Sequence, residues 1–219
     1  MMKKLLQAVA ILVIAMSAAH ATLVTLGAPY WPPAGSSGLG GVEFNVVNGP
    51  GGAFVALGAH PYKHGATMPN DGVSTFYGNT GTYPGEPNRA NWSFDWAFNV
   101  GSCTTCSLLL EFDNDPSAAQ NWTSFGQTPV LPAGTWASDS WNLEMGFLQA
   151  LMGPFDPNAS GSYSFRETIF EGQRAIASTL ITVNVPEPGT ILLLLIGLAG
   201  IAYSTRKIMP RLQRSQLIT

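Results

Sequence analysis

Residues 91–115 read NWSFDWAFNVGSCTTCSLLLEFDND and carry the clearest structural pattern in the chain. The first half places apolar side chains at every second position, namely Trp92, Phe94, Trp96, Phe98 and Val100. Successive side chains of a β-strand point to opposite faces of the sheet. The pattern therefore predicts a strand with one buried aromatic face, and one polar face formed by the residues in between.

The second half of this stretch predicts a return strand over residues 107–113, again with apolar side chains at alternate positions. The connection between the two strands, residues 101–106, contains both cysteines of the chain, Cys103 and Cys106. A close pair of cysteines in an oxidising compartment forms a disulfide. We therefore expect a β-hairpin whose turn is closed by a Cys103–Cys106 bridge.

Similar short runs occur on both sides of this stretch, separated by many of the 24 glycines and 16 prolines of the chain. The predicted strands lie in residues 42–47, 52–59 and 73–78, and in a hairpin over 161–185 with its turn at 171–174. Residues 140–153 predict a strand that runs into a short helix, and residues 60–72 predict a loop. Short strands punctuated by turn residues are typical of all-β domains.

About eight to ten such strands are expected over residues 22–185. This number fits a single β-sandwich, either jelly-roll-like or immunoglobulin-like in its packing. A body of this length can bury a substantial core. We expect that core to contain most of the six tryptophans and eleven phenylalanines of the chain.

The N-terminus has the layout of a secretory signal peptide. Lys3 and Lys4 are followed by an apolar run, and Ala19-His20-Ala21 has the small-x-small pattern of a cleavage site. Residues 1–21 are therefore predicted to be removed, which leaves Thr22 as the first residue of the mature protein.

The C-terminus combines three features in sequence: the triplet Pro186-Glu187-Pro188, an uncharged run over residues 189–205, and a basic tail over 206–219 that begins with Arg206 and Lys207. Seventeen helical residues span roughly 26 Å, which is just enough to cross a hydrocarbon core. Basic residues beside a span favour the cytoplasmic side. The predicted topology places the body outside the membrane and the tail inside.

The exported body is acidic. Residues 22–188 contain all 13 acidic residues but only four basic ones, which gives a net charge of −9, compared with −3 for the whole chain. Proteins that bind nucleic acid present basic surfaces that neutralise phosphates. The composition therefore argues against a nucleic-acid partner and fits a soluble surface outside the cell.

A search for catalytic patterns singles out no active site, and we expect a protein that is not an enzyme. No G-x-S-x-G nucleophile elbow occurs. His60 and His64 are four residues apart, but Pro61 and Gly65 argue against a helical zinc site, and a solvated loop is expected instead. None of the 13 carboxylates stands out as a member of a glycosidase pair.

One weak metal candidate remains. Glu111, Asp113 and Asp115 gather oxygen ligands at the end of a predicted strand, and such ligands suit calcium. The glycine and the closing glutamate of an EF-hand loop are missing. A polar turn is the alternative interpretation, so no resident metal or other cofactor is expected, with calcium kept as a minor possibility.

The C-terminal sequence VPEPGTILLLLIGLAGIAYSTRK resembles the PEP-CTERM sorting signal of exported proteins from Gram-negative bacteria. The resemblance assigns recognition to Pro186, Glu187 and Pro188, and a basic stop to Arg206 and Lys207. It implies processing by an exosortase, a membrane-embedded enzyme of transpeptidase type. Proteins with this signal accompany exopolysaccharide production in biofilms. Prolines on both sides of Glu187 also keep the triplet extended, so the membrane helix can start only after Pro188.

This resemblance leads to a function hypothesis. The protein is expected in the inner membrane with its body in the periplasm, then at the cell surface or in the extracellular matrix, with a structural or adhesive role. One alternative is a carbohydrate-binding module, with or without calcium, and a second is an extracellular glycan hydrolase. The expected partners are the exosortase, the inner membrane and exopolysaccharide.

Overall fold

The computed structural model describes residues 23–25, 41–63, 68–113, 115–117, 119–187, 189 and 196–198. The predicted signal peptide (1–21) with its cleavage residues Ala19, Ala21 and Thr22 lies outside these residues. So do Pro188, most of the predicted span and the basic tail with Arg206 and Lys207. No helix within the described residues has the length and apolar character needed to span a membrane.

The strands form two large sheets. Sheet A has the strand order β1-β2-β3-β7-β10, with bounds Leu23–Thr25, Glu43–Asn48, Phe54–Pro61, Trp92–Asn99 and Trp136–Trp141. Sheet B has the order β4-β12-β11-β8-β9, with bounds Thr75–Tyr77, Arg174–Val185, Gly161–Glu171, Cys106–Asp113 and Trp122–Ser124. All pairs are antiparallel except β4 with β12.

Four small elements complete the described fold: the paired strands β5 (Thr82–Tyr83) and β6 (Glu86–Ala90), the 3₁₀ turn at Pro50–Gly52, and the helix α1 (Gly146–Met152). The predicted all-β class is confirmed. The described residues form twelve strands, more than the eight to ten predicted. The difference arises because β1, β4, β5 and β9 have only two or three residues, too few to produce a visible alternation.

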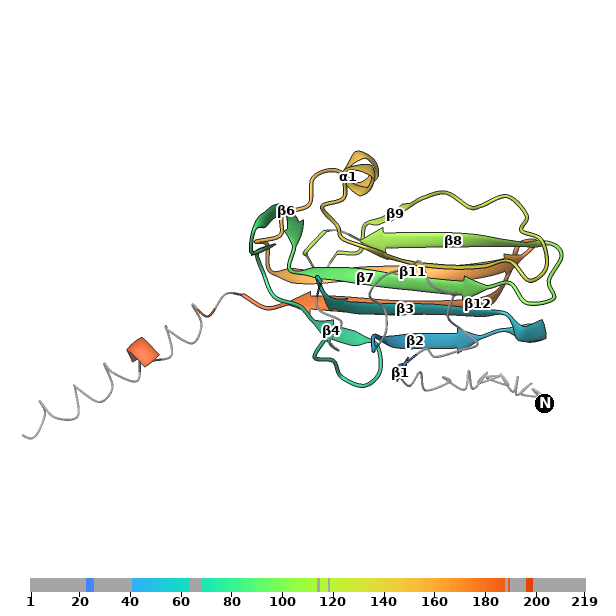
Figure 1. Ribbon diagram of the computed structural model, residues 1–219, viewed down its shortest axis with the longest axis horizontal. Coiled ribbons are helices and arrows are strands. Elements are labelled where there is room, and N and C mark those ends of the chain that lie inside the picture. Colours follow the sequence, from blue (N-terminus) through green and yellow to red (C-terminus); the bar gives the residue numbers. More distant parts are fainter. Residues whose placement is uncertain are drawn as a thin grey trace, which may run out of the picture.

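The inner faces of the two sheets share one core, and the layers are visible in Figure 1. Phe94 of sheet A stacks on Phe165 of sheet B with ring centroids 4.3 Å apart. Trp92, also from sheet A, is 1% exposed and packs edge-on against the same phenylalanine. The apolar residues at alternate positions of β7 face this core, and so do Tyr163, Phe165 and Ile169 of β11, with Glu167 among them.

The hairpin predicted for residues 91–115 is wrong, although both of its strands exist. β7 pairs with β3 and β10 in sheet A, whereas β8 pairs with β11 and β9 in sheet B. The connection is therefore an arch that crosses from one sheet to the other. Alternation fixes which face of each strand is buried but not its partner. In an arch, the apolar faces of β7 and β8 meet across the core.

The second face of β7 also differs from the prediction of a polar, solvated surface. Ser93, Asp95 and Ala97 point away from the core between the sheets, yet each is at most 2% exposed. Phe54 and Ala56 of β3 are buried on the same side and belong to a separate apolar cluster. Sheet A is therefore buried on both faces along its central strands.

The predictions for residues 161–185 and 140–153 are confirmed. β11 and β12 form the expected hairpin, with Glu171 opposite Arg174 and a turn made by Gly172 and Gln173. Gly172 has φ +61°, a backbone conformation that glycine adopts most easily. The predicted strand and short helix over 140–153 appear as the end of β10 followed by α1, which lies at the upper edge of the molecule in Figure 1.

Candidate functional site

The first candidate site is the point where the chain leaves sheet B. β12 ends at Val185, which pairs with Gly161 and is 2% exposed. One residue earlier, the Asn184 carbonyl oxygen accepts a hydrogen bond from Gly78 N at 3.0 Å. The strand cannot continue beyond Val185, because Pro186 has no N–H to donate to a neighbouring strand.

The residues that follow this point are accessible. Pro186 and Glu187 are both exposed, in contrast to Val185. β12 ends at the same end of the molecule as β6 (Figure 1). The predicted recognition triplet thus begins with an exposed, unpaired segment immediately beside a firmly held strand end.

The predicted disulfide is present at the arch between the sheets. Cys103 and Cys106 are joined, with their Cα atoms 5.7 Å apart. Cys106 is fully buried at the start of β8, among apolar residues of both sheets, whereas Cys103 is partly exposed. The bridge therefore fixes the arch just where the chain passes from sheet A to sheet B.

The three weak calcium candidates do not form one group. Glu111 Oε2 accepts a hydrogen bond from Arg166 Nε at 2.7 Å, and the Arg166 guanidinium lies over the Trp122 ring. Asp113 Oδ1 accepts from the backbone N–H of Asp115 at 3.1 Å. Within the described part of the chain, no three His, Cys, Asp or Glu side chains lie close enough together to hold a metal ion.

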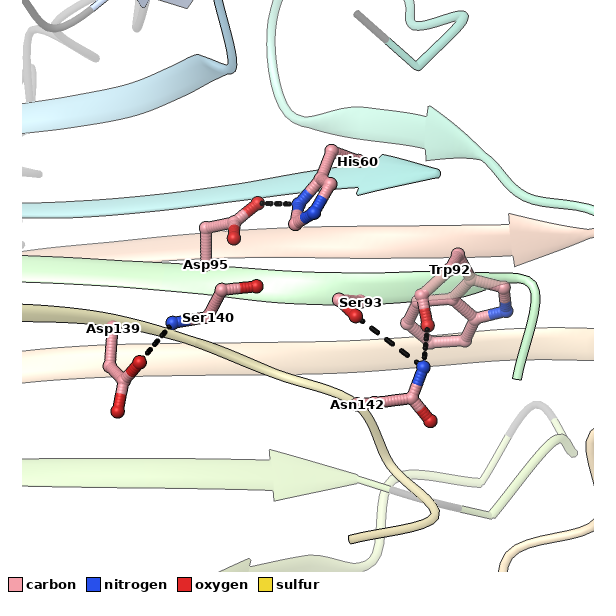
Figure 2. A network of polar contacts seen from close by, with 7 residues as sticks. All are labelled: His60, Trp92, Ser93, Asp95, Asp139, Ser140 and Asn142. Atoms are coloured by element: carbon pink, nitrogen blue, oxygen red, sulfur yellow. Dashed lines mark hydrogen bonds and ion pairs between the residues drawn. The ribbon is translucent and has the colours of Figure 1, made fainter. Parts of the chain in front are cut away.

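A buried polar network lies on the outer side of sheet A (Figure 2). His60 Nδ1 is 2.8 Å from Asp95 Oδ2, and the two residues are 6% and 0% exposed. His60 is the penultimate residue of β3, so its expected position in a solvated loop is wrong; His64 lies outside the described residues. Burial raises the pKa of the Asp95 carboxyl, and the hydrogen bond with His60 opposes that rise.

Asn142 is the second centre of this network. Its Nδ2 donates to the carbonyl oxygens of Ala90 and Trp92 at 2.9 and 3.0 Å, and its Oδ1 accepts from Ala90 N at 3.0 Å. Figure 2 shows the amide reaching from the end of β10 to the start of β7, beside Ser93. Asn142 thereby satisfies backbone groups where the strand ladder ends.

The geometry of this network favours a structural role over a catalytic one. An Asp–His pair resembles part of a nucleophilic triad, but a reacting group has to reach substrate. His60, Asp95 and Asn142 are each at most 6% exposed. Sequence analysis missed the network because His60, Asp95 and Asn142 are widely spaced in sequence and meet only after β3, β7 and β10 pair.

A third feature is a cavity of about 260 Å³ between the two sheets. Its wall is formed by residues of β7, β8 and β10 and of the segment after β9: Trp96, Phe98, Leu108, Leu110, Phe125, Gly126, Thr128 and Trp141. The sequence predicted these aromatic residues to be core residues. Periodicity shows which side chains face inward but not where the two sheets leave a space between them.

Comparison with known protein families identifies the C-terminal segment. A family model for the PEP-CTERM protein-sorting motif matches residues 184–207. The match begins at the last two residues of β12 and includes the triplet Pro186-Glu187-Pro188. No curated protein matches the chain.

Proposed function

We propose that this chain, which carries a PEP-CTERM sorting motif and is therefore an exosortase-sorted exported protein, delivers a β-sandwich body to the cell surface or extracellular matrix. The observation that carries the proposal is the position of the motif relative to the fold. β12 ends at Val185, and the exposed residues Pro186 and Glu187 follow at once. Processing near Pro186–Pro188 would release the body without removing any strand from its sheets.

The physical chemistry of the segment supports this order of events. An enzyme that cleaves or transfers a peptide bond needs an extended backbone whose polar groups are free. Prolines at positions 186 and 188 keep the chain extended and prevent the membrane helix from starting earlier. Because Val185 pairs with β11 and the residues just before it also pair with β4, the body stays folded while the segment enters an enzyme in the membrane.

We infer that the body is a structural or adhesive module linked to exopolysaccharide, not an enzyme. Its acidic composition keeps it soluble outside the cell, and the disulfide suits an oxidising compartment. The buried network around His60 and Asn142 holds strands together and is closed to substrate.

The sorting proposal is tested by replacing Pro186, Glu187 and Pro188 with alanine in the producing bacterium. The variant is expected to remain membrane-bound at its unprocessed mass, whereas the wild-type protein reaches the surface with a shorter chain. Cell fractionation followed by intact-mass spectrometry measures both outcomes. Pro129→Ala, in an exposed loop of the body, is the matched control and should sort like wild type. Unchanged mass and location of the triple variant would contradict the proposal.

One surface favours carbohydrate binding as a second candidate function. The outer face of sheet B carries two cross-strand hydroxyl pairs, Ser164–Thr182 and Thr168–Ser178, in which Thr182 and Ser178 are accessible and Ser164 and Thr168 are buried. Trp122, stacked on Arg166, lies at its β9 edge, and Tyr77 is 43% exposed at its β4 edge. Aromatic faces and hydroxyl groups together suit sugar rings.

Calorimetry with the native polysaccharide, with and without calcium, tests this second function. Trp122→Ala is expected to abolish the heat of binding, whereas Trp136→Ala, an exposed tryptophan on sheet A, should not change it. No heat in the wild-type protein would remove the carbohydrate hypothesis and leave the sorting proposal intact.

A further inference from the structure

The β5–β6 hairpin lies at the end of the sandwich where the chain leaves the fold. β12 ends at Val185, and Figure 1 shows β6 at the same end of the molecule. Hydrogen bonds hold the hairpin there: Gly81 N donates to the Pro157 carbonyl oxygen at 2.7 Å, and Asn91 N donates to the Gly81 carbonyl oxygen at 3.1 Å. The hairpin is therefore fixed beside the point from which the sorting segment starts.

The chain that follows β3 adds a second part to this end of the molecule. Pro61, the last residue of β3, pairs with Trp92, and Tyr62 N donates to the Asn91 carbonyl oxygen at 2.8 Å. The Tyr62 ring meets the Tyr83 ring edge to face, with centroids 5.3 Å apart, and both side chains are partly exposed. Two tyrosines that are remote in sequence thus form one accessible aromatic surface.

An ion pair completes this surface. Lys63 Nζ lies 5.6 Å from the centre of the Tyr62 ring and 5.7 Å from that of Tyr83. The same ammonium pairs with Glu86, which also accepts a hydrogen bond from the Tyr62 hydroxyl at 3.0 Å. We call Tyr62, Lys63, Tyr83 and Glu86 the tyrosine patch. It combines two aromatic rings with one positive and one negative charge, both of them accessible to solvent.

A compact turn carries the tyrosine patch. Tyr83 pairs with Glu86, so Pro84 and Gly85 form the turn of the hairpin, and both are exposed. Gly85 has φ +86°, and proline followed by a glycine at positive φ is typical of a type II turn. The patch is therefore presented at the surface without a long loop.

The sequence leaves little chain between this end of the body and the membrane. Val185 is the last paired residue of β12, and the uncharged run that is predicted to span the membrane begins at Gly189. The three residues in between reach about 10 Å when fully extended. The headgroup layer on one side of a bilayer is about 5–7 Å thick. While the chain is anchored, this end of the sandwich therefore lies against lipid headgroups.

We propose that the tyrosine patch binds the headgroup layer of a zwitterionic phospholipid bilayer while the chain is anchored. The inference rests on the proposed function, because anchoring for sorting is what brings the patch to the membrane. Tyrosine rings are favoured at the level of the headgroups. A zwitterionic headgroup offers a phosphate to Lys63 and a cationic group to Glu86, so each charge keeps an opposite partner. An exposed ion pair is weak enough to be exchanged in this way.

The charges around the patch favour a zwitterionic surface over an anionic one. Lys63 is balanced by Glu86, and Asp156 and Glu187 are exposed at the same end of the body. Anionic lipids attract surfaces with several unpaired basic residues. The patch has no such excess, so its contact with lipid comes from its aromatic rings and its paired charges.

The first test is photo-crosslinking of the full chain to lipid. The chain is purified from a host without exosortase, so that it keeps its C-terminus, and is reconstituted into vesicles of phosphatidylethanolamine and phosphatidylcholine. p-Benzoylphenylalanine, a photoreactive amino acid similar to tyrosine, replaces Tyr83. Illumination is expected to add the mass of a lipid to the peptide that contains position 83, as measured by mass spectrometry.

The matched control places the same amino acid at Gln173, in the exposed turn between β11 and β12. β11 has 11 residues and separates this turn from the tyrosine patch by roughly 35 Å. Position 173 should therefore give at least about tenfold less lipid adduct than position 83.

A longer tether distinguishes attraction from enforced proximity. About ten glycine and serine residues, inserted between Val185 and Pro186, add roughly 17 Å of flexible chain. The patch then stays at the lipid only if it is attracted to it, and the adduct at position 83 should persist.

Variants of this longer chain identify the residues responsible. Replacing both Tyr62 and Lys63 with serine should lower the adduct at position 83 about fivefold, because membrane binding scales with the apolar area that enters the interface. Val130→Ser, an exposed apolar residue beside the arch at the other end of the body, should leave the adduct unchanged.

The outcomes separate this inference from the proposed function. A chain that does not float with the vesicles would refute the anchoring, and the lipid contact with it. A chain that floats but gives equal adducts at positions 83 and 173 would refute the patch alone. The same holds if the adduct disappears with the longer tether, survives the double replacement, or forms only when anionic phosphatidylglycerol is added. The first comparison retains Tyr62 and Lys63, so a misfolded double variant does not prevent a decision.

Discussion

His60 Nδ1 and Asp95 Oδ2 lie 2.8 Å apart on neighbouring strands of sheet A, on the face that points away from the shared core. In the strand register, Asp95 is opposite Gly58 and His60 is opposite Ser93, so the pair is diagonal. Burial of Asp95 is tolerated because the imidazole provides a hydrogen-bond donor at close range. The pair therefore links β3 to β7 through side chains, in addition to the backbone hydrogen bonds between the two strands.

Removing either partner of this pair is expected to destabilise the fold strongly. His60→Ala leaves a buried carboxyl without its donor, and Asp95→Ala leaves a buried imidazole without its acceptor. Each should lower the free energy of unfolding by about 3 kcal/mol. The double variant should lose clearly less than the sum, because neither unpaired group remains. Urea unfolding of all four proteins measures the coupling; strictly additive losses would show that the contact contributes nothing.

Glu167 makes the stability depend on pH in a defined direction. It points into the core between the sheets and is 0% exposed, and burial raises its pKa well above the ordinary value, with only a hydrogen bond from Ala56 N opposing the rise. The folded state thus keeps a proton that the unfolded chain releases. The stabilising contribution is complete below the unfolded pKa of 4.5 and is lost as the pH rises toward the folded pKa.

Glu167→Gln should remove this dependence, because the amide has the same shape and cannot ionise. Relative to wild type, the variant should gain about 1.4 kcal/mol for each pH unit above 4.5, up to the folded pKa of Glu167. Thermal unfolding from pH 4 to pH 9 measures the slope. Glu171→Gln, exposed at the end of the same strand, is the control and should leave the slope unchanged. Equal slopes for wild type and Glu167→Gln would refute the argument.

The alternation of apolar residues predicted most strands correctly, because it reports directly which side of a strand is buried. It could not predict that β7 and β8 belong to different sheets, since the hairpin and the arch place the same residues inward. It also could not predict that Ser93 and Asp95 are buried on the other face. On that face Asp95 contacts His60, and Ala97 packs with apolar residues of β2 and β3, all of them remote in sequence.

The sorting segment was predictable because its three parts are contiguous and each follows from a simple property. Proline has no N–H, an uncharged run partitions into lipid, and basic residues stay on the cytoplasmic side. The cavity around Trp96 was not predictable in the same way. It forms where side chains of β7, β8, β10 and the segment after β9 meet, and no local pattern in the sequence encodes that meeting.

Asn142 is expected to be difficult to replace. Its side chain satisfies Ala90 N, Ala90 O and Trp92 O, all of them buried next to the core. Asn142→Ala leaves these groups unpaired and should cost about 3 kcal/mol of unfolding free energy. Asn142→Asp keeps the acceptor but loses the donor, so it should also destabilise.

The measurement for Asn142 is urea unfolding at neutral pH. Asn121→Ala, at an exposed position before β9, provides the comparison and should change stability by less than about 0.5 kcal/mol. If Asn142→Ala unfolds at the same urea concentration as Asn121→Ala, then water replaces the amide without loss and the network does not stabilise the strand ends.

The disulfide predicts an asymmetry between its two cysteines. Breaking the bridge releases a four-residue loop, which should lower the unfolding free energy by about 2 kcal/mol on the chain-entropy model. Cys103→Ser should lose about this amount, because Cys103 is partly exposed. Cys106→Ser should lose about 1 kcal/mol more, since it places a hydroxyl group in a fully buried apolar cluster.

Chemical denaturation of both variants, with reduced wild-type protein as the reference, measures the difference. Reduced wild type should match Cys103→Ser. Equal losses for the two variants would mean that the arch rearranges and exposes residue 106 once the bridge is gone.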